Sequence, residues 1–388
     1  MERQPVLAGA GIALVGYTSS FAVVLAGLRA VGATDTQATS GLVAVSAATG
    51  IGTLWLSRRH RQPFTLAWST PGAAVLASST AVAGGWAAAV GAFVVCGVLI
   101  LLTGALPALA SLVTRIPAPI AQAMLAGVVL EICLAPVTAL RSHPWQVAPI
   151  LLTWLVLARL APRWSVPAAF GVLLLVVGVD AARGGGVTGT WLPRLTWTTP
   201  HLSLAAVVSI ALPLYVVTMA AQNVPGLAIV KSFGFEVPWR EAMTITGVGT
   251  ILGAPAGGHA INLAAISAAV PASPEAHADP ARRWPAAAAF GATFLVLALL
   301  TTPLVAYLAA APGAVVGTVA GVGLLGTLGG ALSGTVAESP DRTAAVVTFV
   351  VAASGFALAG IGPAFWALVA GLLVHGALRR PRPARVAT

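Results

Sequence analysis

Long runs of apolar residues, separated by short charged or Pro/Gly-rich joints, constrain this sequence more than any motif in it. The runs lie near residues 5–31, 36–56, 64–82, 84–106, 117–139, 145–161, 166–182, 202–230, 237–253, 255–272, 284–311, 313–334, 343–359 and 362–378. A helix that crosses a bilayer needs roughly 20 mostly apolar residues. Because lipid offers the backbone no hydrogen-bond partners, the sequence predicts an all-α integral membrane protein with about fourteen transmembrane helices.

The few charged residues lie mostly in the joints and are unevenly distributed. The formal net charge is +10, although only 8% of the residues are charged. If the N-terminus is cytoplasmic, the outer joints contain only Arg29, Arg141, Arg183 and Arg194. The other 16 of the 20 Lys and Arg residues lie inside, among them Arg379, Arg380, Arg382 and Arg385 of the tail. This bias obeys the positive-inside rule. It predicts a multi-pass membrane protein with cytoplasmic N- and C-termini, and no nucleic-acid partner.

A six-residue phrase occurs twice, as Thr49–Leu54 and, 197 positions later, as Thr246–Ile251. Weaker echoes at offsets of 199 and 194 pair Ala26–Leu28 with Pro225–Leu227 and Ala126–Leu130 with Ala320–Leu324. These offsets predict two homologous halves, residues 1–195 and 196–388, each with about seven spans. Because seven is odd, the second half enters the membrane from the opposite side, which makes a 7+7 inverted repeat.

The third apolar run is broken by Pro71 and Gly72. Ser69 and Thr70 stand just before this proline, which predicts an N-cap and a half-helix that begins at residue 71. The unpaired N–H groups of a first helical turn, together with the helix dipole, favour an anion. The break therefore predicts part of a substrate site, formed by Ser69, Thr70 and Gly72.

The tenth run is broken at the matching place in the second half. Gly257 and Gly258 would allow a small group to approach the backbone closely, and paired half-helices near the mid-plane are typical of transporter sites. No Lys or Arg falls near the middle of a predicted span, so helix dipoles and neutral donors would hold an anion there. Ordinary Pro/Gly kinks, which membrane helices tolerate, are the alternative explanation.

Polar side chains inside apolar runs are costly, so each is a candidate for function. His259 and Asn262 are three residues apart, on one face of a predicted helix. His259 can donate to a carboxylate or carry a coupled proton; the alternative is a structural bond to a backbone carbonyl. Gln222, Asn223 and Tyr17 complete the predicted substrate-binding residues, although amides also act as glue between helices.

Glu131 is the one acidic residue deep inside an apolar run. A lone carboxylate in hydrocarbon is protonated or paired, so Glu131 joins His259 as a candidate for proton coupling. A protonated Glu bonded between helices is the alternative. Cys96 and Cys133 are interpreted as packing residues. Since phosphate-loop and metal-ligand spacings are missing from the sequence, we expect no cofactor, no metal site and no enzyme activity.

Four stretches of the chain resemble the benzoate/proton symporter family of bacterial inner membranes. They are Gly16–Ala22, Ala67–Gly72, Thr218–Gly226 and Ala254–Ala265, and the likeness extends from Gly16 to about Leu373. The resemblance implies uptake of benzoate or a related aromatic carboxylate with a proton.

More distantly, the layout is similar to the fold of uracil/xanthine permeases and sulfate-type anion carriers. This likeness implies a core domain near residues 5–106 and 202–311, a gate domain near 117–182 and 313–378, and elevator-type movement between them. The nucleobase permeases carry functional acids where this chain has Gln222 and Ile261, which favours an anionic substrate. Dimers are common in this fold, so a homodimer is a further expectation.

The sequence as a whole therefore predicts a secondary transporter that moves a small aromatic carboxylate and a proton inward across the bilayer. The half-helix N-termini at Thr70–Ala73 and Gly257–His259 would hold the carboxylate, and apolar residues around Trp68 and Phe21 would face the ring. A passive anion channel on the same fold and a carrier of another small organic anion are alternatives that the residues leave open.

Overall fold

The protein consists almost entirely of helices in the computed structural model, which describes residues 3–79, 84–184 and 192–378. The first half contains α1 (Arg3–Ala30), α2 (Asp35–His60), β1 (Leu66–Trp68), α3 (Thr70–Ala77), α4 (Gly85–Ala105), α5 (Pro107–Thr114), α6 (Ala118–Ser142), α7 (Pro144–Leu160), the 3₁₀ turn η1 (Pro162–Trp164) and α8 (Ser165–Gly184). The second half begins with α9 (Leu204–Ala206), the π-helical turn η2 (Val207–Ala211), α10 (Leu212–Thr218), the π-helical turn η3 (Met219–Asn223), α11 (Val224–Ser232), α12 (Trp239–Gly253) and the 3₁₀ turn η4 (Ala254–Ala256). It continues with β2 (Ile261–Leu263), the 3₁₀ turn η5 (Ile266–Ala268), α13 (Ala269–Ala272), the 3₁₀ turn η6 (Pro280–Arg282), α14 (Trp284–Leu308), α15 (Gly313–Val336), α16 (Arg342–Ala353) and α17 (Pro363–Leu378).

Eight helices of the described residues are long and apolar enough to cross a membrane. Three shorter apolar helices, α7, α16 and α17, add to them. Every predicted apolar run contains helical residues, so the predicted helical membrane class is confirmed, while the count of about fourteen spans stays a prediction. The four tail arginines used for the predicted orientation lie outside the described residues.

The repeated phrase has a packing role in the first half that explains its residue types. Gly50 of α2 meets Gly291 of α14, since a Cβ on Gly50 would lie 2.8 Å from the Gly291 carbonyl oxygen. Two residues on, a Cβ on Gly52 would lie 2.5 Å from Leu66 Cδ1 of β1. Thr53 Oγ1 accepts a hydrogen bond from the Leu66 N–H at 2.9 Å. The phrase therefore joins α2 to a helix on one side and to a strand on the other.

The second copy makes the same contacts in the second half. Gly247 of α12 meets Gly97 of α4, with a Cβ on Gly247 2.9 Å from the Gly97 carbonyl oxygen. A Cβ on Gly249 would lie 2.7 Å from Ile261 Cδ1 of β2. Thr250 Oγ1 accepts from the Ile261 N–H at 3.1 Å. The pairs α2–α14 and α12–α4 are thus equivalent, and small residues let each pair of backbones approach closely.

The two broken runs meet in a short antiparallel strand pair. In its register Leu66 lies opposite Leu263, Ala67 opposite Asn262 and Trp68 opposite Ile261. A further backbone hydrogen bond at each end, 2.9 and 3.0 Å long, extends the pair. Non-helical backbone inside a membrane must find partners within the protein. Each strand supplies them to the other, so two breaks that would be costly alone stabilise each other.

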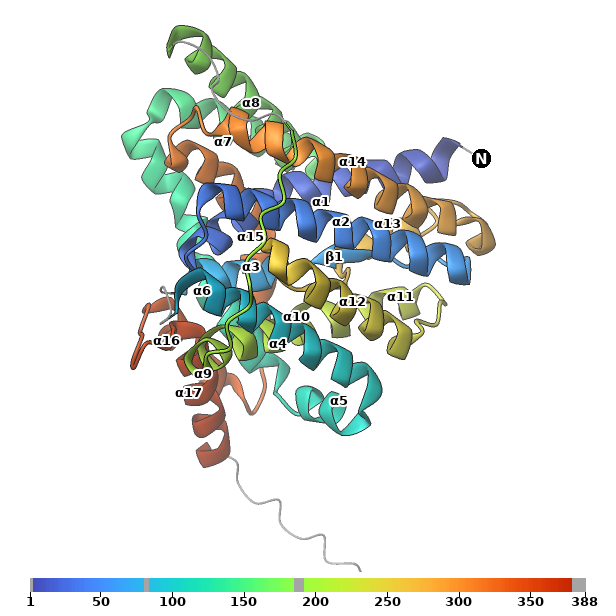
Figure 1. Cartoon of the computed structure of the whole chain (residues 1–388), viewed down its shortest axis with the longest axis vertical. Coiled ribbons are helices and arrows are strands. Elements are labelled where there is room, and N and C mark those ends of the chain that lie inside the picture. The colour runs from blue at the N-terminus through green and yellow to red at the C-terminus, as the bar shows by residue number, and fades with distance from the viewer. Residues whose placement is uncertain (1–2, 80–83, 185–191, 379–388) are drawn as a thin grey trace, which may run out of the picture.

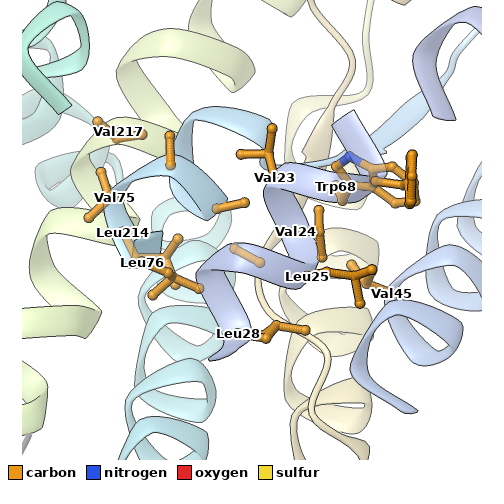
Figure 2. Packing of buried hydrophobic residues seen from close by; sticks show 14 of the residues in the cluster. Val23, Val24, Leu25, Leu28, Val45, Trp68, Val75, Leu76, Leu214 and Val217 are labelled. Atoms are coloured by element: carbon orange, nitrogen blue, oxygen red, sulfur yellow. The ribbon is translucent and has the colours of Figure 1, made fainter. Parts of the chain in front are cut away.

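Helix α1 lies at the centre of the buried apolar cluster (Figure 2), which surrounds the strand pair. Side chains of α1 in this view are Val23, Val24, Leu25 and Leu28, and they lie near Val75 and Leu76 of α3 and Val45 of α2. A Cβ on Gly27 would lie 2.4 Å from the Ala73 carbonyl oxygen. Glycine is therefore required where α1 crosses the short helix α3.

The remaining helices form groups around this centre. Helices α14 and α12 pack on α2 and α4, whereas α15 and α16 pack along α6, and α17 packs on α16. In Figure 1, α7, α8, α16 and α17 lie on the left, and α2, α11, α12 and α13 lie on the right. Helix α15, which packs along α6, also contacts α1, which packs on α14 and α3. This contact joins the helices around α6 to the helices around the strand pair.

Candidate functional site

A cavity of about 140 Å³ lies beside the strand pair, bounded by α1, α3, η3, η5, α14 and α15. Its polar side chains are Ser19, Ser20, Thr70, Gln222, Ser267 and Thr327. The rings of Trp68, Phe290 and Phe294 and aliphatic side chains of α1, η5 and α15 supply the apolar lining. The described residues that line this cavity, hereafter the site cavity, include no charged side chain.

Helix α3 begins at this cavity, since Thr70 and Pro71 line it. The predicted N-cap is confirmed: Ser69 Oγ accepts a hydrogen bond from the Gly72 N–H at 3.1 Å, and Pro71 stands in the first turn. The partial positive charge of the helix N-terminus therefore lies at the cavity. Gly72 is turned elsewhere, because a Cβ on it would lie 2.4 Å from Leu214 Cδ1 of α10.

Ser69 is held in place by two buried side chains. Thr218 Oγ1 donates to Ser69 Oγ at 2.7 Å, and His259 Nε2 donates to the Ser69 carbonyl oxygen at 3.2 Å. His259 is 1% exposed and does not line the site cavity. Its contact is the structural backbone bond that was the alternative reading of the sequence. This bond links His259 to the residue that caps α3, while its Nδ1 is buried without a hydrogen-bond partner among the described residues.

Gln222 reaches the site cavity from the π-helical turn η3. Pro225 follows this turn and lacks the N–H that would bond to the carbonyl four residues earlier, and π-helical turns often lie at functional sites. Asn223 points away, since its Oδ1 accepts from the Leu263 N–H at 2.8 Å. Asn262 Nδ2 lies 3.5 Å from Gln222 Oε1. The amides thus connect η3 to β2, and Gln222 alone of them lines the cavity.

The predicted helical face shared by His259 and Asn262 is wrong, because residues 261–263 form β2. Side chains of a strand point alternately to opposite faces, and Ile261 favours this pleated conformation. Asn262 is fully buried, and its Nδ2 donates to the Leu263 carbonyl at 2.9 Å.

Gly257 and Gly258 do not line the site cavity and do not begin a half-helix. Gly257 follows η4 with a φ of +92°, a conformation that suits glycine at the end of a helix. A Cβ on Gly41 of α2 would lie 2.4 Å from the Gly257 carbonyl oxygen. Gly257 and Gly258 thus allow the chain that follows η4 to pack closely on α2.

Tyr17 lies behind the cavity and does not line it. Its hydroxyl shares a hydrogen bond of 2.7 Å with Thr301 Oγ1, and its ring centroid is 5.3 Å from that of Trp68. Trp68 also packs edge-on against Phe294 at 5.2 Å and donates from Nε1 to Ser20 Oγ at 2.9 Å. These contacts fix the orientation of the Trp68 ring that faces the cavity.

Three further residues line the site cavity, although the sequence analysis did not predict them: Ala265, Ile266 and Ser267. The bounds of β1 and β2 differ by 195 positions. Applied to residues 70–72, this offset gives residues 265–267. The offset between the two strands therefore predicts that residues 265–267 lie where residues 70–72 lie. This segment has no proline or glycine to mark a helix break, whereas residues 255–258 have both.

A second cavity, of about 540 Å³, lies farther along α1 and is called the outer cavity here. Glu131 of α6 lines it, as do Arg29 and Asp35, which form an ion pair of 2.7 Å. Between the two cavities α1 touches α15, where a Cβ on Gly323 would lie 2.4 Å from the Ser19 carbonyl oxygen. Of the two candidates for proton coupling, Glu131 lies at a cavity and His259 does not.

A family model described as benzoate membrane transport protein matches residues 1–377. The chain belongs to this benzoate membrane transport family. One family relative, the inner membrane protein YdcO of Escherichia coli (strain K12), is 39% identical over 368 residues, which cover 94% of this chain and 93% of YdcO. The benzoate membrane transport protein of Acinetobacter baylyi is 26% identical over 381 residues, which cover 97% of this chain and 95% of the relative.

Solved structures of anion transporters have a similar fold. The transmembrane domain of the cyanobacterial bicarbonate transporter BicA matches with a TM-score of 0.64 and 17% identity, covering 95% of this chain and 97% of that domain. Murine Slc26a9, an anion transporter in its inward-facing state, matches with a TM-score of 0.63 and 16% identity, covering 98% of this chain and 69% of Slc26a9. At identities of 17% and 16%, this likeness shows only that the chain has a similar fold.

Proposed function

We propose that the protein is a secondary active transporter that takes up benzoate or a related aromatic carboxylate with a proton across the bacterial inner membrane. The observation that carries the proposal is an uncharged cavity where a helix begins and aromatic rings gather. The family description and the relative from Acinetobacter name benzoate, and anion transporters share the fold. Transport of this kind involves no enzyme chemistry and needs no cofactor.

The carboxylate would bind at the N-terminal end of α3. Thr70 Oγ1, the Gln222 amide and the Ser267 hydroxyl are donors from three different elements around one cavity. The helix dipole adds a partial positive charge. Neutral donors hold an anion less tightly than a buried arginine would, which suits a carrier that must release its substrate.

The aromatic ring would lie among Trp68, Phe290 and Phe294, the last two of which have ring centroids 4.8 Å apart. Aromatic pairs of this kind favour tilted or offset contacts with a further ring. The cavity volume of about 140 Å³ is close to the volume of about 150 Å³ at which an apolar protein cavity takes up benzene. Size and lining therefore suit a single-ring carboxylate.

The other predicted site residues would act through the ones that line the cavity. His259 holds the Ser69 carbonyl, Asn223 holds β2, and Tyr17 packs on Trp68. We assign them positioning roles, together with Asn262. Gly72, Gly257 and Gly258 would serve the close packing of α3 and α12 on their neighbours.

Alternating access would arise from movement of the predicted core domain (residues 5–106 and 202–311) against the predicted gate domain (117–182 and 313–378). With about fourteen spans in an inverted repeat and both termini cytoplasmic, the site cavity would face the cytoplasm and the outer cavity the opposite side. The contact between Ser19 and Gly323 separates these cavities. An elevator-type shift of α1 along α15 would move the site from one side to the other.

Uptake of radiolabelled benzoate into proteoliposomes tests the function. We expect accumulation above equilibrium when the outside is acidic, and loss of that accumulation when a protonophore collapses the gradient. Neutral benzoic acid crosses lipid unaided, so protein-free liposomes give the background to subtract. A passive channel would show electrical currents without gradient-driven accumulation, and that result would contradict the symport proposal.

Glu131→Gln tests the proposed site of proton coupling. The amide keeps the shape of the side chain at the outer cavity but cannot exchange a proton, so we expect benzoate exchange at equal pH to persist and gradient-driven accumulation to be lost. Glu275→Gln is the matched control, because Glu275 is exposed and pairs with Arg163 at 3.8 Å, away from both cavities. Accumulation that survives in Glu131→Gln would place the coupled proton elsewhere.

A further inference from the structure

Helix α2 ends in a stripe of residues that changes from apolar to cationic. Ile51, Leu54, Trp55, Arg58 and Arg59 line a shallow groove of about 610 Å³ on one face of the helix. Their spacing of three and four residues places them side by side along the helix. Ile51 is 61% and Trp55 59% exposed. The stripe, hereafter the α2 stripe, is thus an open surface on a helix long and apolar enough to cross the membrane.

The cationic end of the α2 stripe is only partly neutralised. Glu241 of α12 accepts from Arg59 Nε at 3.1 Å and lies 2.9 Å from His60 Nε2. Trp55 Nε1 also donates to Glu241, at 3.4 Å. Among the described residues no hydrogen bond or ion pair involves the guanidinium of Arg58. One carboxylate therefore faces two arginines, and the groove keeps a net positive charge that complements an anion.

We propose that the α2 stripe binds one anionic phospholipid, with its phosphate at Arg58 and Arg59 and an acyl chain along Ile51 and Leu54. From residue 51 to residue 58 an α-helix rises about 10 Å, enough to pass from the acyl region to the headgroup level. Tryptophan and arginine are the residues that favour this level of a membrane. A free anion would leave the apolar half of the stripe unused, and a zwitterionic lipid would leave the positive charge unmatched.

The opposite face of α2 connects this stripe to the strand pair. Thr53, two residues from Trp55, accepts the hydrogen bond from the first N–H of β1. Gly52 packs on Leu66 of the same strand. A lipid that fixes the end of α2 therefore also supports β1 and the start of α3. This consequence follows from packing alone and does not depend on which substrate is transported.

Thermal unfolding of the full-length protein in detergent tests the proposal, with phosphatidylglycerol and phosphatidylcholine of identical chains as probes. A ligand that binds the folded state alone raises the midpoint temperature, so we expect a rise with phosphatidylglycerol and none with phosphatidylcholine. Arg58→Gln should weaken the phosphatidylglycerol effect about fivefold in concentration, the worth of one basic residue near an anionic surface. Arg342→Gln removes an exposed arginine from the start of α16 and should change nothing.

Three results would overturn the proposal. They are equal shifts with the two lipids, an equal shift with glycerol phosphate that lacks acyl chains, and an unchanged phosphatidylglycerol response in Arg58→Gln. Native mass spectrometry of the same variants gives a second reading, because lipid retention is counted directly and does not depend on thermal unfolding. Benzoate uptake is a separate measurement, so failure of the lipid proposal and failure of the transport proposal are distinguishable.

Discussion

Gly16→Leu is expected to remove most benzoate uptake while leaving the protein folded. Gly16 lines the site cavity in the middle of α1, and a Cβ on it would meet nothing within 4 Å. The leucine side chain would extend into a cavity of about 140 Å³ and occupy the space of the substrate ring. A substrate ring that binds beside this leucine would be overpacked in the cavity. Overpacking costs about 1–3 kcal/mol, and each 1.4 kcal/mol is about tenfold in affinity. We therefore expect a loss of about tenfold or more in uptake.

Gly171→Leu is the matched control for this substitution. Gly171 also lies within a helix, α8, and a Cβ on it would meet nothing within 4 Å, but it does not line the site cavity. Leucine is a better helix former than glycine, so neither variant should unfold earlier than the parent protein in thermal denaturation. Full uptake by Gly16→Leu would show that the substrate binds elsewhere.

The most local features of this fold could be predicted from the sequence. The Ser69 cap follows from the order of polar residue, proline and glycine, because a cap is made within one helical turn. The repeated phrase predicts two related halves, and this division stays a prediction. The packing that explains its residue types appears only in three dimensions. Gly50 and Gly247 each meet a glycine of the other half, and Thr53 and Thr250 each bond a strand N–H.

The residues around the site were harder to predict, because a local pattern does not say which face meets the ligand. A glycine pair after a proline suits both a binding loop and a helix end, and Gly257 and Gly258 form the end of a helix. His259 and Tyr17 each make one buried hydrogen bond, to the Ser69 carbonyl and to Thr301, and neither lines the site cavity. The lining of the cavity by α15 depends on contacts between residues some 300 positions apart and has no signature in the sequence near Thr327.

Gly323→Leu is expected to stop transport more completely than it lowers stability. Gly323 is where α15 touches α1, and a Cβ on it would lie 2.4 Å from the Ser19 carbonyl oxygen. Backbone cannot rotate away as a side chain can, so the helices must separate. Overpacking among side chains costs about 1–3 kcal/mol and a clash with backbone costs more, so thermal unfolding of the purified variant is measured beside its uptake. Ser19 and Gly323 both line the site cavity, so the leucine and the displaced backbone would disturb the site as well as the contact between the two helices.

Gly326→Leu separates this effect from a general effect of leucine on α15. Gly326 is on the same helix, and a Cβ on it would meet nothing within 4 Å. We expect wild-type uptake from Gly326→Leu and a loss of at least about tenfold from Gly323→Leu in the same proteoliposome assay. In the proposed elevator-type shift α1 slides along α15 in every cycle, and this close contact requires a residue without a side chain at position 323. Normal transport by Gly323→Leu would mean that the cycle never needs this contact, and α1 would then not move along α15.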